Sequence, residues 1–437
     1  MNLALVKGTG VATYGFELAS ALSRHGHQIE GLFGLPGAPE ERLREIVFFD
    51  AFGRGVERAP RSWPTRIASD LSAAVTGLRP KRVPLTDFVE KQELAYRIPS
   101  LDRLFTRVDM FRIAHDNFAR FGQFTTVHLD DPPDVMHWTY PVPLRLAGAR
   151  NVYTIHDLIP IILPYTTLDA KRFYFRLVHA CARSADAIAT VSEASRRDIV
   201  RQLDADPARV INTYQCVTPL ERLVQDTAGE DDAAWVSRLF GLENKKFFLF
   251  FGAIEPKKNV RRIVEAFLGL DTQSRLVVVS AGGWSNEGEI QLLNGSKRGS
   301  GIGGDRLVRL DYLSRDMLLR LIRCAKAVIF PSLYEGFGLP ILEAMQQGTM
   351  VVTSRISSMP EVAGDAAILV DPYNTREIAH ALSHLDGITP GADEAAIVRQ
   401  QAARFDESRY VSKLEGLYTK VCSGDSTRSR GTVTETV

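Results

Sequence analysis

The chain has 437 residues, of which 45% are hydrophobic and 24% charged, with a formal net charge of +1. This length favours two or three domains, and the near-neutral charge gives no case for nucleic acid as a partner. The four cysteines include no CxxC pair, so neither a zinc site nor a disulfide framework is indicated. Without a signal-peptide pattern or about 18 uninterrupted apolar residues, we expect a cytoplasmic protein that is at most membrane-associated.

Apolar runs alternate with helical patterns in the first half of the chain, which is typical of parallel α/β sheets. Helices are predicted at residues 12–25 and Glu193–Leu203, and Ser192 is placed to cap the second helix. The predicted strands are residues 3–6, 28–33, 135–138, 151–155, 187–191 and 210–214.

Residues 51–125 do not fit this alternation. They hold 13 Arg and Lys against 8 Asp and Glu, interleaved with Phe, Trp and Tyr. We predict an inserted basic helical segment whose charges face solvent. The alternative is a surface for an anionic lipid headgroup or a lipid-linked acceptor.

The alternation restarts after residues 226–232, an acidic polar stretch that is typical of a linker. Strands are predicted at residues 247–254, 276–280, 307–310, 327–330, 351–354 and 368–370. We therefore expect an α/β protein of two Rossmann-like, doubly wound domains that face each other across a cleft, with ligands at the carboxyl ends of the strands. The expected parts are an N-terminal domain (1–226), a C-terminal domain (240–405), a helix (406–422) that packs back on the N-terminal domain, and a disordered tail (423–437).

The strongest functional signal lies between Phe330 and Val370. A predicted strand runs into a glycine-containing turn and then a helix that begins near Pro340. Backbone N–H groups and the positive end of a helix dipole at such a turn suit an anion. Glu335 and Glu343 bracket this turn, and their carboxylates can accept hydrogen bonds from hydroxyl groups. The combination suits a ligand with both phosphate and sugar, and it predicts a nucleotide-sugar enzyme.

Two further strand ends carry candidate site residues. Lys257 and Lys258 lie in the run FGAIEPKKN, where two ammonium groups could neutralise a diphosphate as its bond to a sugar breaks. The alternative is an exposed basic turn. Gly8 and Gly10 follow the first predicted strand and would let a ligand or the facing domain approach the backbone closely. A purely structural turn is the alternative there.

His156 and Asp157 stand at the end of the predicted strand 151–155 and are candidates for the cleft, as is His137 on weaker grounds. Each histidine could instead be a packed or surface residue. Residues 204–206 (DAD) formally match a metal-diphosphate motif, but they precede Pro207 and are interpreted as a helix-terminating turn. With two lysines and a helix N-terminus available for phosphates, we predict no metal site.

Five blocks of the chain resemble, in the same order, the retaining glycosyltransferases of family 4, which have the GT-B fold. They are TGVATYGFELASAL, TIHDLIPIILP, TVSEASRRDI, GAIEPKKN, and the run that contains YEGFGLP and PEVAGDAAILVDP. The resemblance extends over most of the chain. Lys257 stands where many members have arginine, so charge is kept but bidentate phosphate contact is lost. Met350 stands where the family usually has proline.

The resemblance implies that the C-terminal domain binds the donor and the N-terminal domain the acceptor. Lys257 and Lys258 would then take the diphosphate, and Glu343 the ribose hydroxyls. Glu335, Gly336 and the amides of Phe337, Gly338 and Leu339 would contact the sugar and phosphates. The glycine loop with Gly8 and Gly10 would face the donor phosphates, while His156 would contact the sugar near its reacting carbon. The implied catalytic residues are His156, Asp157, Glu335 and Lys258.

The implied activity is transfer of a hexose, with mannose favoured, from a nucleotide diphosphate sugar to a glycan or lipid-linked glycan in polysaccharide biosynthesis. GDP-mannose is the favoured donor, no cofactor is expected, and peripheral contact with the inner face of a membrane is a further expectation. The alternatives are a GT-B nucleotide-sugar hydrolase or epimerase, and a non-catalytic GT-B scaffold.

Overall fold

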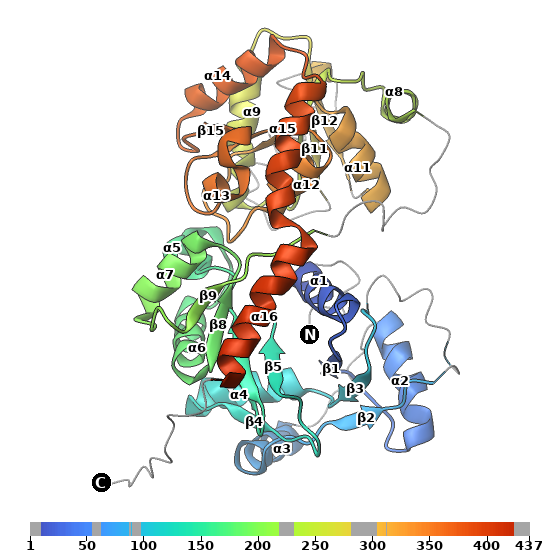
Figure 1. Ribbon diagram of the computed structural model, residues 1–437, viewed down its shortest axis with the longest axis vertical. Helices are drawn as coiled ribbons and strands as arrows, with labels where there is room; N and C mark the ends of the chain where they lie inside the picture. The colour runs from blue at the N-terminus through green and yellow to red at the C-terminus, as the bar shows by residue number, and fades with distance from the viewer. Residues whose placement is uncertain are drawn as a thin grey trace.

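The computed structural model describes residues 10–54, 63–86, 89, 98–217, 231–280, 304–311 and 313–423. Figure 1 shows two α/β domains stacked along the long axis of the molecule, with the N-terminal domain at the bottom. Helix α16 (Glu407–Ser423) runs down from the C-terminal domain along the N-terminal domain. The expected pair of α/β domains built on parallel sheets is confirmed.

The N-terminal domain contains strands β1 (Glu30–Phe33), β2 (Lys81–Val83), β3 (Arg103–Thr106), β4 (Thr125–Val127), β5 (Val135–Trp138), β6 (Leu144–Leu146), β7 (Arg150–Thr154), β8 (Ala187–Thr190) and β9 (Val210–Asn212). Its main sheet is parallel and has the order β5-β7-β8-β9, and a second sheet has the order β1-β3-β2 with β2 antiparallel. Strands β4 and β6 form a separate pair. Every residue of β8 is buried, so its residues Ala187–Ala189 are all apolar and do not alternate with polar ones.

The helices of this domain are α1 (Gly10–Arg24), α2 (Glu41–Arg54), α3 (Trp63–Thr76), α4 (Met110–Phe121), α5 (Ile159–Ile162), α6 (Lys171–Ser184) and α7 (Glu193–Leu203). The predicted cap of α7 is confirmed, because the Ser192 side chain accepts a hydrogen bond from the Ser195 amide at 3.0 Å. None of the helices in the described ranges is both long and apolar enough to cross a membrane.

The C-terminal domain contains strands β10 (Phe247–Phe251), β11 (Arg275–Val279), β12 (Leu307–Leu310), β13 (Ala327–Phe330), β14 (Met350–Ser354) and β15 (Ile368–Val370). They form one parallel sheet in the order β12-β11-β10-β13-β14-β15. Strands β10 and β13 lie at its centre and are fully buried, so their apolar residues form the middle of the core. The helices are α8 (Asp232–Phe240), α9 (Val260–Leu268), α11 (Arg315–Cys324), α12 (Leu339–Gln346), α13 (Met359–Ala363), α14 (Thr375–Asp386) and α15 (Ala392–Ala402).

Helix α16 connects the two domains through its own packing. Near its start, Glu407 accepts two hydrogen bonds from the Arg24 guanidinium at the end of α1, at 2.9 and 2.7 Å. Further along, Leu417 and Val421 pack against residues of β7 and β8. The C-terminal helix therefore covers the sheet of the N-terminal domain.

Two predictions about the organisation of the chain were wrong. Residues 51–125 are not a solvated helical insertion, because β3 lies within them and pairs with β1, and α4 buries Met110, Ile113 and Phe118. The prediction relied on the surplus of basic residues and gave no weight to these apolar positions. The linker predicted at residues 226–232 ends early, since Asp231 caps α8 and Asp232 is its first residue. The predicted strand at residues 3–6 and the tail from residue 424 lie outside the described residues.

Candidate active site

The two lysines lie on a short turn that leaves the carboxyl end of β10. Residues Pro256–Lys258 form a 3-10 turn (η5), and Asn259 follows in the left-handed conformation (φ 61°). The buried Asn259 side-chain amide donates to the Pro331 carbonyl at 2.9 Å and to the Pro372 carbonyl at 2.7 Å. This asparagine ties the lysine turn to the segments that follow β13 and β15, and it fixes where the two ammonium groups lie.

Lys258 and Glu335 form a buried ion pair. The Lys258 Nζ lies 2.7 Å from Glu335 Oε1, and the two side chains are 15% and 9% exposed. Burial disfavours the charge of Glu335, but Lys258 and Lys257 outweigh it and lower the pKa of this carboxyl. Burial likewise opposes the charge of Lys257, but Glu335, Asp157 and Glu255 outweigh it and raise the pKa of its ammonium. Lys257 and Glu335 are therefore both charged at neutral pH.

The turn after β13 has the predicted geometry. Gly338 has φ 105°, a value that only glycine adopts without strain, and α12 begins at Leu339 with Pro340 in its first turn. The Phe337 side chain is buried against Phe405, with ring centroids 5.5 Å apart. The side chain of Phe337 therefore anchors the turn, and α12 begins four residues after Glu335.

Glu343 has a partner that the sequence did not indicate. It lies on α12, and its Oε1 accepts a hydrogen bond of 2.7 Å from Arg315, the first residue of α11. The Glu343 side chain is 11% exposed and that of Arg315 is 42% exposed. Its carboxylate is therefore oriented by a partially exposed arginine.

His156 follows β7 and is held by its neighbours. Its Nε2 lies 2.9 Å from the Thr139 carbonyl, so Nε2 carries the proton of the neutral ring. Burial lowers the pKa of His156 more than the Thr139 carbonyl and Asp157 raise it. The ring also meets Tyr14 edge-on, with centroids 4.7 Å apart. His156 is therefore a fixed, neutral imidazole whose Nδ1 can accept a hydrogen bond.

Asp157 and Gly336 bring the two domains together. The Asp157 Oδ1 accepts a hydrogen bond from the Ile159 amide at 3.0 Å, which shapes the loop after His156. A β-carbon at Gly336 would lie 2.8 Å from the His156 carbonyl oxygen and 3.0 Å from Asp157 Oδ2. Only glycine fits at this position. The predicted site residues of both domains therefore meet at one place, with Asp157 close enough to influence Lys257.

The surroundings of His137 and Gly10 differ from those of the residues above. The His137 Nδ1 lies 2.7 Å from the Tyr418 hydroxyl, and its Nε2 lies 2.7 Å from Thr154 Oγ1. Both ring nitrogens of His137 therefore have hydrogen-bond partners within the protein. Gly10 is exposed at the start of α1, and a β-carbon there would meet no atom within 4 Å. Gly8 lies outside the described residues. Within the described ranges no group of three or more His, Cys, Asp or Glu could hold a metal ion, and the absence of a metal requirement stays a prediction.

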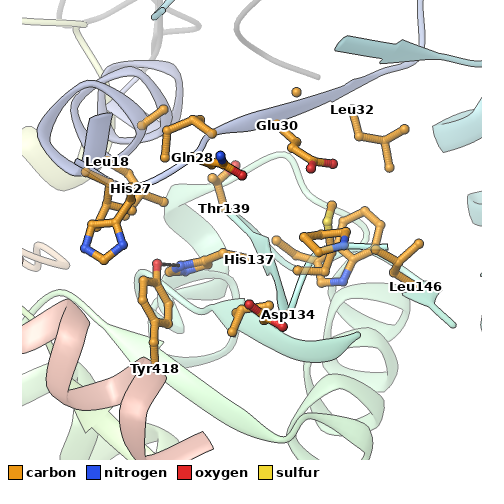
Figure 2. Close-up of a pocket in the computed structure, with 18 of the residues that line it drawn as sticks. Leu18, His27, Gln28, Glu30, Leu32, Asp134, His137, Thr139, Leu146 and Tyr418 are labelled. Atoms are coloured by element: carbon orange, nitrogen blue, oxygen red, sulfur yellow. Dashed lines mark hydrogen bonds between the residues drawn. The ribbon is translucent and has the colours of Figure 1, made fainter. Parts of the chain in front are cut away.

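A large hollow of about 1350 Å³ lies elsewhere, inside the N-terminal domain. Figure 2 shows His137 hydrogen-bonded to Tyr418 at its margin, with Glu30 from β1 nearby. Its walls come from α1, β1, β5 and α16, and His137 is the one candidate site residue among the described residues that line it. Among the described strands, β1 and β5 are the edges of their sheets.

Sequence reasoning missed several residues that organise the site. Asn259 and Arg315 position the lysines and Glu343, and Ser195, at the start of α7, lies within hydrogen-bond distance of the carbonyls of His156 (2.7 Å) and Gly336 (3.2 Å). Ser195 and Asn259 stand inside blocks that carried the family resemblance, which was the available signal. Nothing in the sequence pairs Arg315 with Glu343, since 27 residues separate them in the chain.

Comparison with known proteins finds related glycosyltransferases. The family model described as Glycosyl transferases group 1 matches residues 236–385, and the model described as Glycosyltransferase Family 4 matches residues 8–213. O-antigen chain mannosyltransferase B of Escherichia coli is 34% identical over 250 residues, which are 56% of this chain and 63% of that protein. The serotype-specific mannosyltransferase WbdA of Escherichia coli is 29% identical over 255 residues, which are 56% of this chain and 30% of that protein.

The chain thus spans less than two thirds of the length of these curated relatives. Among solved structures, Anabaena HepE in complex with UDP and glucose is similar with a TM-score of 0.58 and 15% identity, over 90% of this chain and all of that one. At this identity the likeness concerns the fold alone, and it agrees with the GT-B arrangement of two Rossmann-like domains. The two family models match most of one domain each, with residues 214–235 unmatched between them, and the chain therefore belongs to the family 4 glycosyltransferases.

Proposed function

We propose that this protein is a retaining glycosyltransferase that moves a hexose from a nucleotide diphosphate sugar to a hydroxyl group of a glycan or lipid-linked glycan in polysaccharide biosynthesis. One observation carries the proposal. The cluster of Lys257, Lys258 and Glu335 lies beside the N-terminus of α12 and faces His156 and Asp157 across the domain boundary. Such a cluster offers positive charge for a diphosphate and hydrogen-bonding groups for a sugar at one place.

Each group has a role that its surroundings support. Lys257 and Lys258 neutralise the diphosphate as it departs, together with the amide groups of residues 336–339. Glu335 accepts hydrogen bonds from sugar hydroxyls, and Glu343 binds the ribose hydroxyls, with Arg315 holding its carboxylate in place. The Nδ1 atom of the neutral His156 accepts a hydrogen bond from the sugar near its reacting carbon, because Nε2 is committed to Thr139.

Front-face substitution is the proposed route to retention. The bond between the anomeric carbon and the diphosphate oxygen breaks, and the acceptor oxygen bonds to the same face of that carbon. The acceptor proton passes to the departing phosphate oxygen. Asp157 already uses one carboxylate oxygen to shape its own loop, and its charge lies close to Lys257. These contacts favour an orienting role for Asp157 over a covalent one.

Mannose is the favoured sugar and GDP-mannose the favoured donor. The support comes from the relatives named above, whose printed names are those of mannosyltransferases. A panel of GDP-, UDP- and dTDP-sugars, each with and without mixtures of lipid-linked acceptors, tests the activity and the donor together. The readout is released nucleotide, for the unaltered protein, Lys258→Ala and a surface control, Lys420→Ala.

Acceptor-dependent release from one donor, lost in Lys258→Ala and kept in Lys420→Ala, is the expected result. Equal turnover without acceptor would replace the proposal with a nucleotide-sugar hydrolase or epimerase. Failure of every donor to bind would leave a non-catalytic scaffold.

Peripheral membrane contact is a separate proposal, and it rests on the surface of the N-terminal domain. Arg79, Lys81 and Arg82 are exposed at and before β2, and Leu43 and Ile46 are about half exposed on α2. Basic and apolar groups together favour an anionic lipid surface. Sedimentation with anionic vesicles should lose most of the bound protein when the three basic residues are replaced by glutamine. Unchanged sedimentation of that variant would contradict the proposal.

A further inference from the structure

A carboxylate of the C-terminal domain caps a helix of the N-terminal domain. Glu361 lies on α13, and its two oxygens accept hydrogen bonds from the amides of Glu193 (3.0 Å) and Ala194 (3.1 Å). These amides belong to the first turn of α7, where backbone N–H groups lack partners within the helix. Ser192, the cap from the same domain, takes a third amide, that of Ser195. Side chains of both domains thus accept the hydrogen bonds that the backbone N–H groups in the first turn of α7 donate.

The same helix makes two more polar contacts with the C-terminal domain. The Tyr334 hydroxyl donates a hydrogen bond to Asp198, in the second turn of α7. The Ser195 hydroxyl lies between the carbonyl oxygens of His156 and Gly336, at 2.7 and 3.2 Å. Helix α7 therefore contacts Tyr334 and Gly336, on both sides of Glu335, and also the loop that carries His156.

The chemistry of Glu361 indicates more than packing. Burial raises the pKa of its carboxyl, while the two amides oppose that effect. A carboxylate that is desolvated and held mainly by amides at a helix N-terminus gives a directional contact, and its strength depends on alignment with the helix dipole. Such a contact requires a particular position and orientation of α13 relative to α7.

That placement is the one that assembles the candidate site. With α7 docked on α13, Gly336 lies against His156 and Asp157, and Asp157 lies close enough to Lys257 to raise the pKa of its ammonium. Separation of α7 from α13 would withdraw His156 and Asp157 from the lysines while leaving the lysine cluster itself intact. Catalysis depends on such alignment to within about 1 Å.

We propose that Glu361 is a positioning residue of the glycosyltransferase: by capping α7 across the domain boundary, it sets the arrangement in which His156 and Asp157 face the lysine cluster. This inference rests on the proposed function for its catalytic consequence. It assigns Glu361 no contact with donor or acceptor. It predicts that removal of the cap acts on turnover, and that affinity for the donor nucleotide, held within the C-terminal domain, is kept.

The test compares Glu361→Gln with Glu243→Gln, an exposed glutamate of the same domain as a matched control. Hydrogen exchange at the Glu193 and Ala194 amides should rise at least tenfold in Glu361→Gln and stay unchanged in the control. Nucleotide affinity by calorimetry should stay within about twofold, whereas kcat should fall about tenfold to a hundredfold with little change in KM for the donor. If Glu361→Gln folds poorly, Tyr334→Phe, which removes the adjacent contact with Asp198, provides the second variant.

The outcomes separate this inference from the proposed function. Unchanged amide exchange in Glu361→Gln would overturn the inference whether or not the protein turns over a nucleotide sugar. Faster exchange with unaltered kcat would also overturn it, because the cap would then have no role in turnover. An unaltered protein that turns over no donor defeats the proposed function and, with it, the catalytic part of the inference, while the exchange data still decide whether the cap exists.

Discussion

At the scale of single residues, the site depends on one position that has no side chain. Gly336 lies so close to His156 and Asp157 that any β-carbon would overlap the His156 carbonyl. Its φ is not in the left-handed region, so the requirement is for space and not for backbone conformation. The neighbouring Gly338, with φ 105°, meets the conformational requirement instead.

Replacement of Gly336 by alanine should therefore push the two domains apart with little effect on either domain. We expect nucleotide-sugar turnover to fall by about two orders of magnitude, because a displacement of about 1 Å between reacting groups has that effect. The melting temperature should change little, and the control Gly416→Ala, at an open position in α16, should keep full activity. Full activity of Gly336→Ala would show that the contact with His156 is not part of the working geometry.

The charges of Lys257 and Lys258 lead to a second prediction at this scale. Two ammonium groups and the N-terminus of α12 supply the positive charge that a divalent ion would otherwise give a leaving diphosphate. Turnover should therefore be within about twofold in the presence and absence of excess EDTA. Loss of turnover in EDTA that is restored by magnesium would contradict this.

At the scale of helices and strands, a series of buried side-chain hydrogen bonds fixes the C-terminal helix to the N-terminal domain. The Tyr418 hydroxyl of α16 contacts His137 of β5, which contacts Thr154 of β7, and Thr154 in turn lies 3.0 Å from the Tyr14 hydroxyl of α1. Tyr14 meets His156 edge-on. Helix α16 is thereby connected to the strand end that carries the candidate histidine.

Removal of the Tyr418 hydroxyl should remove the first hydrogen bond of this series, the one to His137. In Tyr418→Phe one nitrogen of the buried His137 loses its partner, which costs about 1–3 kcal/mol in the free energy of unfolding. Denaturant unfolding measures this loss, with Tyr373→Phe, whose ring is half exposed, as the control. Equal stability of the two variants would mean that the hydrogen bond contributes nothing to the docking of α16.

The elements themselves could be read from the sequence where local signals were strong. Strands β5, β12, β13 and β15 and helix α7 have the predicted bounds, because continuous apolar runs and the Ser192 cap define them locally. The segment 51–125 was misread, because the pairing of β3 with β1 joins residues 73 positions apart, and no local pattern reports it. The lysines and Glu335 could be proposed from motifs because each motif is local in the sequence. The contacts of Glu361 and Arg315 join residues far apart in the chain, so only the folded structure reveals them.

At the scale of the whole molecule, buried histidines couple stability to pH. Burial, with a smaller contribution from His156, lowers the pKa of His137 to about 3. An unfolded histidine titrates near its ordinary value of about 6.5. Between these pH values His137 binds a proton in the unfolded chain but not in the folded chain. The free energy of unfolding therefore falls as the pH falls below about 6.5. His156, whose pKa is also lowered, acts in the same direction.

The stability of the unaltered protein should therefore decline between pH 7 and pH 5, and His137 should account for up to about 1.4 kcal/mol per pH unit of that slope. Urea unfolding at several pH values measures it. His137→Gln keeps a hydrogen-bonding side chain but cannot titrate, so its slope should be shallower even if its stability at pH 7 is lower. The exposed His384→Gln is the matched control. An identical slope in His137→Gln and the unaltered protein would show that His137 is protonated in the folded state, which would contradict its burial between Thr154 and Tyr418 as a neutral ring.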